Sequence, residues 1–202
     1  IAGALTGIGG KLLGRQGAHS LTIFSVALAF CTSLYLAKLI LLDHVPAVNH
    51  VLYTWGISGQ FVFNIGYLLD PLSAMMLVIV NFISLAVHVY SIGYMKDDPG
   101  YQRFFAYIAL FTFAMSMLVM ANNFLQLYFG WEAVGLVSYL LIGFWFRRQS
   151  AVNGSLKAFL VNRVGDFGFL LGIALAFSSF SSVDYATIFA SVSSHTAQTI
   201  SL

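Results

Sequence analysis

Apolar positions along this chain fall into long segments that are separated by short polar connections. Five such segments each have about the twenty residues that a membrane-spanning helix needs. They cover approximately 21–42, 72–95, 104–121, 124–146 and 155–177. Segments of this length are typical of membrane helices rather than of strands. The pattern therefore predicts an all-α integral membrane protein in which antiparallel helices form a transmembrane bundle.

The remaining segments complete one membrane domain over 1–202. Residues 44–69 alternate between apolar and polar side chains, which predicts a short β-hairpin on the outer side. Asp70 and Pro71 follow it, and this pair is typical of a helix start, with an ion-entry role for Asp70 as the alternative. We interpret 1–10 as the end of a first helix that runs into a glycine-rich turn, and 178–202 as an outer loop.

Composition and charge support a membrane protein and exclude other classes. Hydrophobic residues make up 59% of the chain and charged residues only 8%, which a soluble domain of this size could not bury. Most basic residues lie in or beside alternate connections, which are therefore expected to face the cytoplasm or the mitochondrial matrix. These residues are Lys11, Arg15, Lys96, Arg103, Arg147, Arg148 and Lys157. They are not clustered as in a nucleic-acid-binding protein, so no nucleic-acid partner is expected.

No redox centre is expected in this chain. Its single cysteine, Cys31, cannot supply the four thiolates of a typical iron–sulfur cluster. Of the five histidines only His88 falls within a predicted span, so a pair of haem ligands inside the membrane is missing. We therefore expect neither a bound cofactor nor a metal.

The fourth apolar segment contains one acid, Glu132. At a rise of about 1.5 Å per residue, it would lie about 13 Å from one membrane surface and about 22 Å from the other. A charged group at that depth costs at least ~2.5 kcal/mol, and such groups usually face the bundle interior or a water path. Glu132 is therefore the first candidate for proton translocation.

The next helix carries Arg163 and Asp166, whose three-residue spacing permits an ion pair. This pair is either part of a proton path or a structural salt bridge. Glu132, Gly135 and Tyr139 share one helical face, which should pack inside the bundle. Asn81, Ser84, His88 and Ser91 form a similar polar face in an earlier span. His88 is either a hydrogen-bonded packing residue or a proton relay.

Two motifs resemble a known family. The run from Tyr128 to Gly143, YFGWEAVGLVSYLLIG, and the run from Lys157 to Asp166, KAFLVNRVGD, are similar to the antiporter-like L chains of respiratory complex I, the proton-translocating NADH:quinone oxidoreductase. The mitochondrial equivalents are the chain 5 subunits. The similarity extends from the tail of the first helix through Phe189, and these 202 residues would correspond to roughly the first third of a longer protein.

The resemblance implies proton translocation that is driven by electron transfer in partner subunits, and it implies which residues carry it. The proton-channel acid of the family falls on Glu132 and its polar pair on Arg163 and Asp166, while His88, Lys157 and Tyr139 are secondary relay candidates. The implied acid works with a lysine on a later helix, so proton pumping is expected to need more than these 202 residues.

The resemblance also implies partners and a location. We expect other complex I membrane subunits, with flavin, iron–sulfur clusters and quinone held in the partner subunits. The protein would lie in the bacterial cytoplasmic membrane or the mitochondrial inner membrane. A subunit of an Mrp-type cation/proton antiporter and a purely structural membrane scaffold remain as alternatives.

Overall fold

A computed structural model describes residues 1–59 and 61–195, and it shows five long helices, one hairpin and one short helix. The elements in chain order are α1 (Ala2–Ala37), a short π-helix η1 (Lys38–Leu42), β1 (Val48–Ser58), β2 (Phe61–Leu69), α2 (Pro71–Tyr94), α3 (Tyr101–Val119), α4 (Phe124–Ile142), α5 (Gln149–Phe180) and α6 (Tyr185–His195). The five long helices are each apolar enough to span a membrane. The prediction of a helical membrane bundle with a short antiparallel hairpin is thus confirmed.

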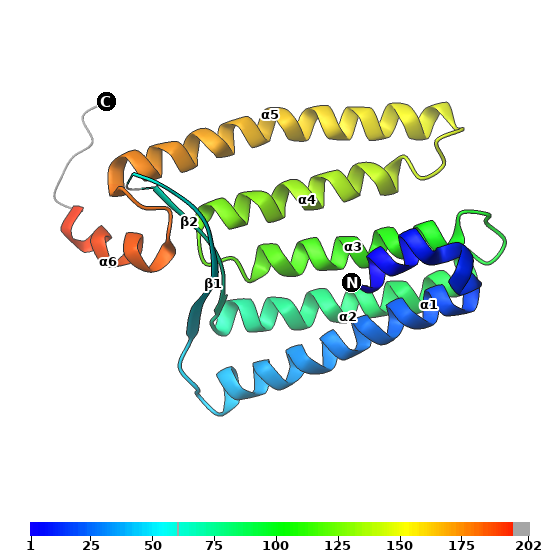
Figure 1. Cartoon of the computed structure of the whole chain (residues 1–202), viewed down its shortest axis with the longest axis horizontal. Coiled ribbons are helices and arrows are strands. Elements are labelled where there is room, and N and C mark those ends of the chain that lie inside the picture. The colour runs from blue at the N-terminus through cyan, green and yellow to red at the C-terminus, as the bar shows by residue number, and fades with distance from the viewer. Residues whose placement is uncertain (60, 196–202) are drawn as a thin grey trace.

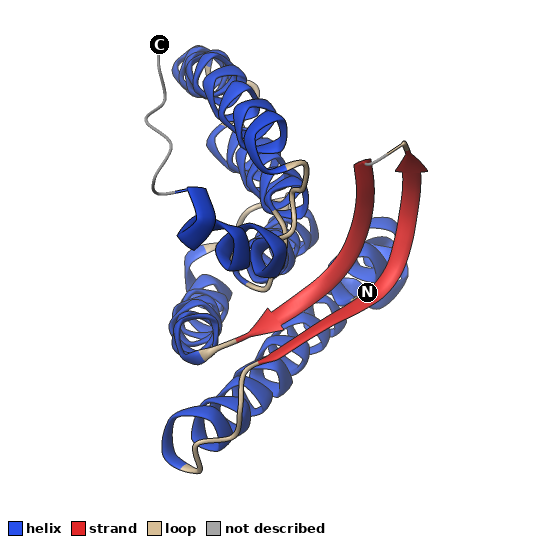
Figure 2. Ribbon diagram, turned by 90° about the vertical axis from the view of Figure 1, so that its left-hand side faces the viewer, coloured by secondary structure: helices blue, strands red, loops and turns tan. Residues whose placement is uncertain are grey.

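The long helices lie side by side, with the hairpin and α6 together at one end (Figure 1). Figure 2 looks onto this end, where the hairpin crosses as a curved red ribbon. Helix α1 packs against α2 and α3, α3 packs against α4, and α4 packs against α5. We call the end with the hairpin the outer end, and the end with the α2–α3 and α4–α5 connections the basic end.

Two connections differ from the sequence-based expectation. The expected turn near Gly7 to Lys11 is wrong, because the helix continues to Gly14, where φ is 66° and the axis bends. Glycine adopts this left-handed conformation at little cost. The expected outer loop at 178–202 contains α6, whose first turn is capped by the Asp184 carboxylate, which accepts a hydrogen bond from the Thr187 amide at 3.2 Å. Residues 196–202 lie outside the described part of the chain.

The outer end is closed by buried amide groups. The Gln126 side chain on α4 forms two hydrogen bonds of 2.9 Å with the backbone of Gly66 in β2, one to its N–H and one to its carbonyl. Asn122 donates to the Asn49 side chain, and Asn123 donates to the Asn64 carbonyl, both at 2.9 Å. Buried backbone groups need such partners. The hairpin is therefore fixed to the α3–α4 turn.

Two sequence-based expectations about helix ends and faces are met. Asp70 caps α2, accepting a hydrogen bond from the Ser73 amide at 2.7 Å, while the Ser73 hydroxyl accepts one from the Asp70 amide at 2.8 Å. Asn81, His88 and Ser91 are all buried on α2, so this polar face points into the bundle.

At the basic end, the Arg15 guanidinium donates to the carbonyl oxygens of Lys96 and Asp98, which joins α1 to the α2–α3 connection.

Candidate functional site

Glu132 and Arg163 form an ion pair between two helices. Glu132 lies in the middle of α4, and the Arg163 Nη1 atom on α5 donates to its Oε2 atom. The two side chains are only 18% and 34% exposed. The other carboxylate oxygen of Glu132, Oε1, is buried and has no hydrogen-bond partner among the described residues. The acid therefore has one oxygen held by a cation and one oxygen available to another donor.

Asp166 is the second carboxylate beside Arg163. Its Oδ2 atom lies 3.5 Å from the Arg163 Nε atom, so the predicted pair within α5 is present. Its Oδ1 atom accepts a hydrogen bond of 2.8 Å from the indole N–H of Trp131 on α4. The Asp166 side chain is 6% exposed, and burial of a charge requires such partners. Arg163 thus serves two carboxylates on two different helices.

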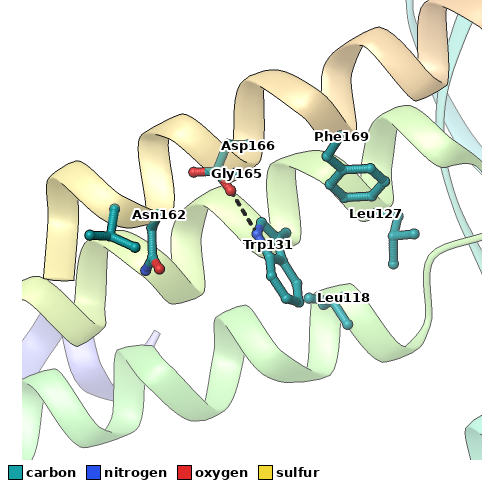
Figure 3. A pocket seen from close by; sticks show the side chains of 8 residues that line it. Leu118, Leu127, Trp131, Asn162, Gly165, Asp166 and Phe169 are labelled. Atoms are coloured by element: carbon teal, nitrogen blue, oxygen red, sulfur yellow. Dashed lines mark hydrogen bonds between the residues drawn. The ribbon is translucent and has the colours of Figure 1, made fainter.

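A cavity of 490 Å³ lies beside this cluster, between α3, α4 and α5. Figure 3 shows Asp166 pointing from α5 toward Trp131, with Asn162 and Phe169 on either side. Leu118 and Leu127 line it from α3 and α4. The cavity is apolar apart from the Asp166, Trp131 and Asn162 groups, so these polar groups determine what it can hold.

Trp131 is a site residue that sequence reasoning missed. Its signal in the sequence was its position directly before Glu132 in an apolar segment. An indole N–H in such surroundings usually needs an acceptor. The spacing along one helix cannot show that this acceptor is Asp166 on the next helix.

Tyr139 lies near the ion pair but does not touch it. Its ring packs against Phe159 of α5 with a centroid distance of 5.3 Å. The Arg163 guanidinium also lies over the Phe159 ring, with its Cζ atom 4.8 Å from the ring centroid. A Cβ atom at Gly135 would lie 3.5 Å from the Arg163 Nη2 atom. The face of α4 that carries Glu132, Gly135 and Tyr139 thus packs on α5, as expected.

The structure does not bring Lys157 or His88 to this cluster. Lys157 is exposed on α5 and forms no ion pair within the described part of the chain. His88 is fully buried on α2, where its Nδ1 atom bonds the Ser84 carbonyl oxygen at 2.8 Å. Its Nε2 atom has no partner among the described residues, and it lines a separate cavity of 420 Å³ between α2 and α3. Their roles as secondary relays remain predictions.

The chemistry that this cluster offers is proton exchange at a carboxylate beside a cation. One guanidinium faces two carboxylates, so movement of Arg163 toward one leaves the other less compensated. Within the described residues, no three His, Cys, Asp or Glu side chains gather as metal ligands would. The contacts that its side chains make are those of an ion-pair cluster of Glu132, Arg163 and Asp166.

Comparison with known proteins relates this cluster to a family. Residues 55–105 match the family described as "NADH-Ubiquinone oxidoreductase (complex I), chain 5 N-terminus". Residues 121–202, which include the whole cluster, match "NADH:quinone oxidoreductase/Mrp antiporter, TM". The chain belongs to this family of antiporter-like membrane subunits.

Individual relatives agree with this assignment. The NADH-quinone oxidoreductase subunit L of Neisseria meningitidis serogroup A is 54% identical over 193 residues, which are 94% of this chain and 29% of the relative. The NADH-ubiquinone oxidoreductase chain 5 of Dictyostelium discoideum is 44% identical over 202 residues, which are 100% of this chain and 30% of the relative. The chain thus spans about 30% of the length of these relatives.

Two solved structures share the fold. The Mrp complex from Dietzia sp. superposes with a TM-score of 0.73 at 22% identity, covering 92% of this chain and 19% of the matched chain. The archaeal membrane-bound sulfane sulfur reductase superposes with a TM-score of 0.76 at 13% identity, covering 93% of this chain and 37% of the matched chain. The helical arrangement of this family is therefore found in membrane complexes of different kinds.

Proposed function

We propose that this chain forms part of a proton-translocating membrane subunit of an NADH:quinone oxidoreductase. The observation that carries the proposal is the pairing of Glu132 with Arg163 inside a helical bundle of the matching family. An ionisable group at such depth is expensive unless it has a function or a partner. Here the partner is shared with Asp166, which makes the pairing exchangeable.

The proposed mechanism is a charge-controlled switch. While Arg163 contacts Glu132, the cation stabilises the ionised acid. When the guanidinium moves toward Asp166, Glu132 loses that compensation and takes up a proton. Return of the cation favours release of that proton. The Oε1 atom of Glu132, which has no hydrogen-bond partner among the described residues, is where the proton would arrive.

The surroundings support a small movement of this kind. Arg163 approaches Asp166 through Nε at 3.5 Å and Glu132 through Nη1, so a modest rotation of the guanidinium changes which contact is closer. The Trp131 indole donates to the Oδ1 atom of Asp166, while Arg163 lies near Oδ2, so the two contacts use different oxygens of the carboxylate. Trp131 therefore acts as a positioning residue that keeps Asp166 at the cavity.

The energy for this switch would come from electron transfer in other subunits. The names of the relatives place them in NADH-quinone oxidoreductases. On this proposal, the flavin, iron–sulfur clusters and quinone lie in partner subunits, and other membrane subunits of the complex pack against this chain. The membrane would be the bacterial cytoplasmic membrane or the mitochondrial inner membrane.

A second candidate is a subunit of an Mrp-type cation/proton antiporter, because an Mrp complex shares the fold. Purification of the full-length protein with its partners distinguishes the two. Flavin and iron–sulfur clusters that co-purify support the oxidoreductase. A preparation that transports cations and contains neither group would support the antiporter.

Proton pumping by a Glu132→Gln variant tests the proposed function. The substitution keeps the size of the side chain and removes the exchangeable proton. We expect NADH oxidation to persist while proton uptake into inverted vesicles, measured with a pH-sensitive dye, falls at least about tenfold per NADH, in the range typical of a lost acid–base group.

Asp97→Asn is the matched control, since Asp97 is an exposed acid in the α2–α3 connection. It should pump as the wild type does. Equal pumping by the Glu132→Gln variant and the wild type would contradict the proposal. Loss of assembly without any change in pumping by the complexes that remain would instead support a structural scaffold.

A further inference from the structure

A third cavity lies at the basic end, and Arg103 is its charged lining residue. Its volume is 320 Å³, roughly ten times the volume that a water molecule occupies in the liquid. It is bounded by the first turns of α3, the last turns of α4 and the beginning of α5 (Figure 1). Its lining includes Arg103, Tyr107, Tyr139 and Ser155. The cavity thus combines a cation with hydroxyl groups.

Arg103 is the charged residue of this cavity, and within the described residues it takes part in no ion pair. Its Nη2 atom donates to the Phe144 carbonyl oxygen at 3.0 Å, which caps the end of α4. Its Nε atom is buried and has no hydrogen-bond partner within the described residues. Among those residues, no carboxylate forms an ion pair with Arg103. The hydrogen bond to Phe144 therefore leaves the Arg103 charge outside any ion pair and its Nε donor without a partner among the described residues.

The rings around Arg103 hold its guanidinium in place. The Cζ atom lies 4.6 Å from the Phe144 ring centroid and 5.2 Å from that of Phe146. Such contacts hold a guanidinium without neutralising it. The nearest acidic group, Asp98, is already engaged, because it accepts hydrogen bonds from the Trp145 indole at 2.9 Å and from the Gly100 amide at 2.7 Å. Asp98 therefore contributes only a longer-range attraction to Arg103, and a preorganised guanidinium outside any ion pair can form charge-assisted hydrogen bonds with a bound anion.

The position of the cavity identifies the source of the anion. The basic end carries seven Lys or Arg residues in or beside its connections. The acids in its α2–α3 connection are two, Asp97 and Asp98, so positive charges outnumber negative ones at this end. The ends of membrane-spanning helices lie near the lipid headgroups, where basic pockets between helices bind anionic phosphates. Phospholipid phosphate is therefore present there at high local concentration.

We propose that this cavity binds the phosphate of an anionic phospholipid, with Arg103 as the residue that contacts it. The Tyr107 hydroxyl group lies in the same lining and can donate a hydrogen bond to another phosphate oxygen, whereas the Ser155 hydroxyl already donates to the Val152 carbonyl oxygen at 2.9 Å. A net negative headgroup is preferred because Arg103 takes part in no ion pair within the described residues. This site does not depend on the proposed proton translocation.

The test measures lipid retained by the purified full-length protein with its co-purifying subunits. The protein is placed in nanodiscs of phosphatidylcholine that contain phosphatidylglycerol, and native mass spectrometry counts retained phosphatidylglycerol at high salt. High salt screens the general attraction of exposed basic residues. We expect Arg103→Gln to lower retention at least about tenfold, as for a lost charge-assisted hydrogen bond.

Arg147→Gln is the matched control, since it removes the same charge from an exposed position outside the cavity lining. Its retention should equal that of the wild type. A second variant, Val152→Phe, fills the cavity from an exposed position and leaves Arg103 in place. It should lose retention as well, so the test survives if Arg103→Gln fails to fold. Wild-type retention by Val152→Phe, or equal loss by Arg147→Gln and Arg103→Gln, would overturn the proposal.

Inorganic phosphate distinguishes the two sources of this ligand chemistry. On our proposal, phosphate added to the nanodiscs at the same concentration as the lipid does not displace phosphatidylglycerol. Displacement in the wild type but not in Arg103→Gln would assign the cavity to a free anion and overturn the lipid assignment.

Discussion

Single side chains at the basic end hold the connections between helices. Asp98 accepts one hydrogen bond from Trp145 and another from the Gly100 amide, and thereby joins the α2–α3 connection to the end of α4. The Trp145 hydrogen bond is the main reason that the pKa of Asp98 is lowered, with further contributions from Gly100, Arg103 and Arg15. The ionised carboxylate is therefore the form that the folded protein prefers.

This preference predicts a loss of stability in acid. A carboxylate whose pKa is lower in the folded state stabilises the fold above its unfolded pKa, about 4 for aspartate, and loses that contribution as the pH falls through the folded pKa. At pH values below about 4, we expect the thermal unfolding midpoint of the wild type to fall more steeply with decreasing pH than that of Asp98→Asn. Midpoints followed by Trp fluorescence would measure this difference. Parallel pH profiles for the two proteins would contradict the assignment.

The residue scale also shows what spacing along a helix reveals and what it does not. The pair of Arg163 and Asp166 follows from three-residue spacing within one helix, and the structure contains it. The pairing of Arg163 with Glu132 depends on how α4 and α5 are rotated against each other. The hydrogen bond between Trp131 and Asp166 depends on the same rotation. The spacing of residues on one helix does not encode this rotation.

At the scale of elements, α3 and α4 approach each other closely at Gly130. A Cβ atom there would lie 2.8 Å from the Cα atom of Leu118 and 2.9 Å from its Cβ atom. Small residues at such points let two membrane helices pack with little space between their backbones. This contact helps to set the position of α4, and hence of Glu132, relative to α3.

Gly130→Ala should separate these helices. Since the clash is with backbone atoms that cannot rotate away, we expect a loss of roughly 1–3 kcal/mol in unfolding free energy. Thermal unfolding of the protein in nanodiscs would report it as a lower midpoint. Gly168→Ala is the control, because nothing lies within 4 Å of a Cβ atom at that helical position. An unchanged midpoint for Gly130→Ala would show that α3 and α4 are less tightly packed than described.

Element boundaries were predicted better for the spans than for the connections. A run of apolar residues long enough to cross the membrane identifies a helix, and all five runs are helical. The bend of α1 lies at Gly14 because a glycine within a helix can adopt a positive φ, but several glycines nearby fit that role equally well by sequence. Helix α6 was missed because it is short and its polar residues are typical of a loop.

The whole molecule has two different ends with one ion-pair cluster between them. Amide side chains close the outer end, while basic residues, among them Arg103 in its cavity, occupy the other. The distribution of Lys and Arg along the sequence predicted that these basic connections share one end. The outer amide network was not predicted, since Gln126 and Gly66 are 60 residues apart and meet only in the folded chain.

The central claim is that Glu132 changes protonation while Arg163 moves between two carboxylates. Infrared difference spectroscopy of the full-length protein during NADH turnover measures this most directly, because a protonated carboxylic acid has its own C=O band. We predict a turnover-dependent band that disappears in Glu132→Gln and persists in the Asp97→Asn control. A band that is unchanged in Glu132→Gln, with pumping intact, would contradict the account.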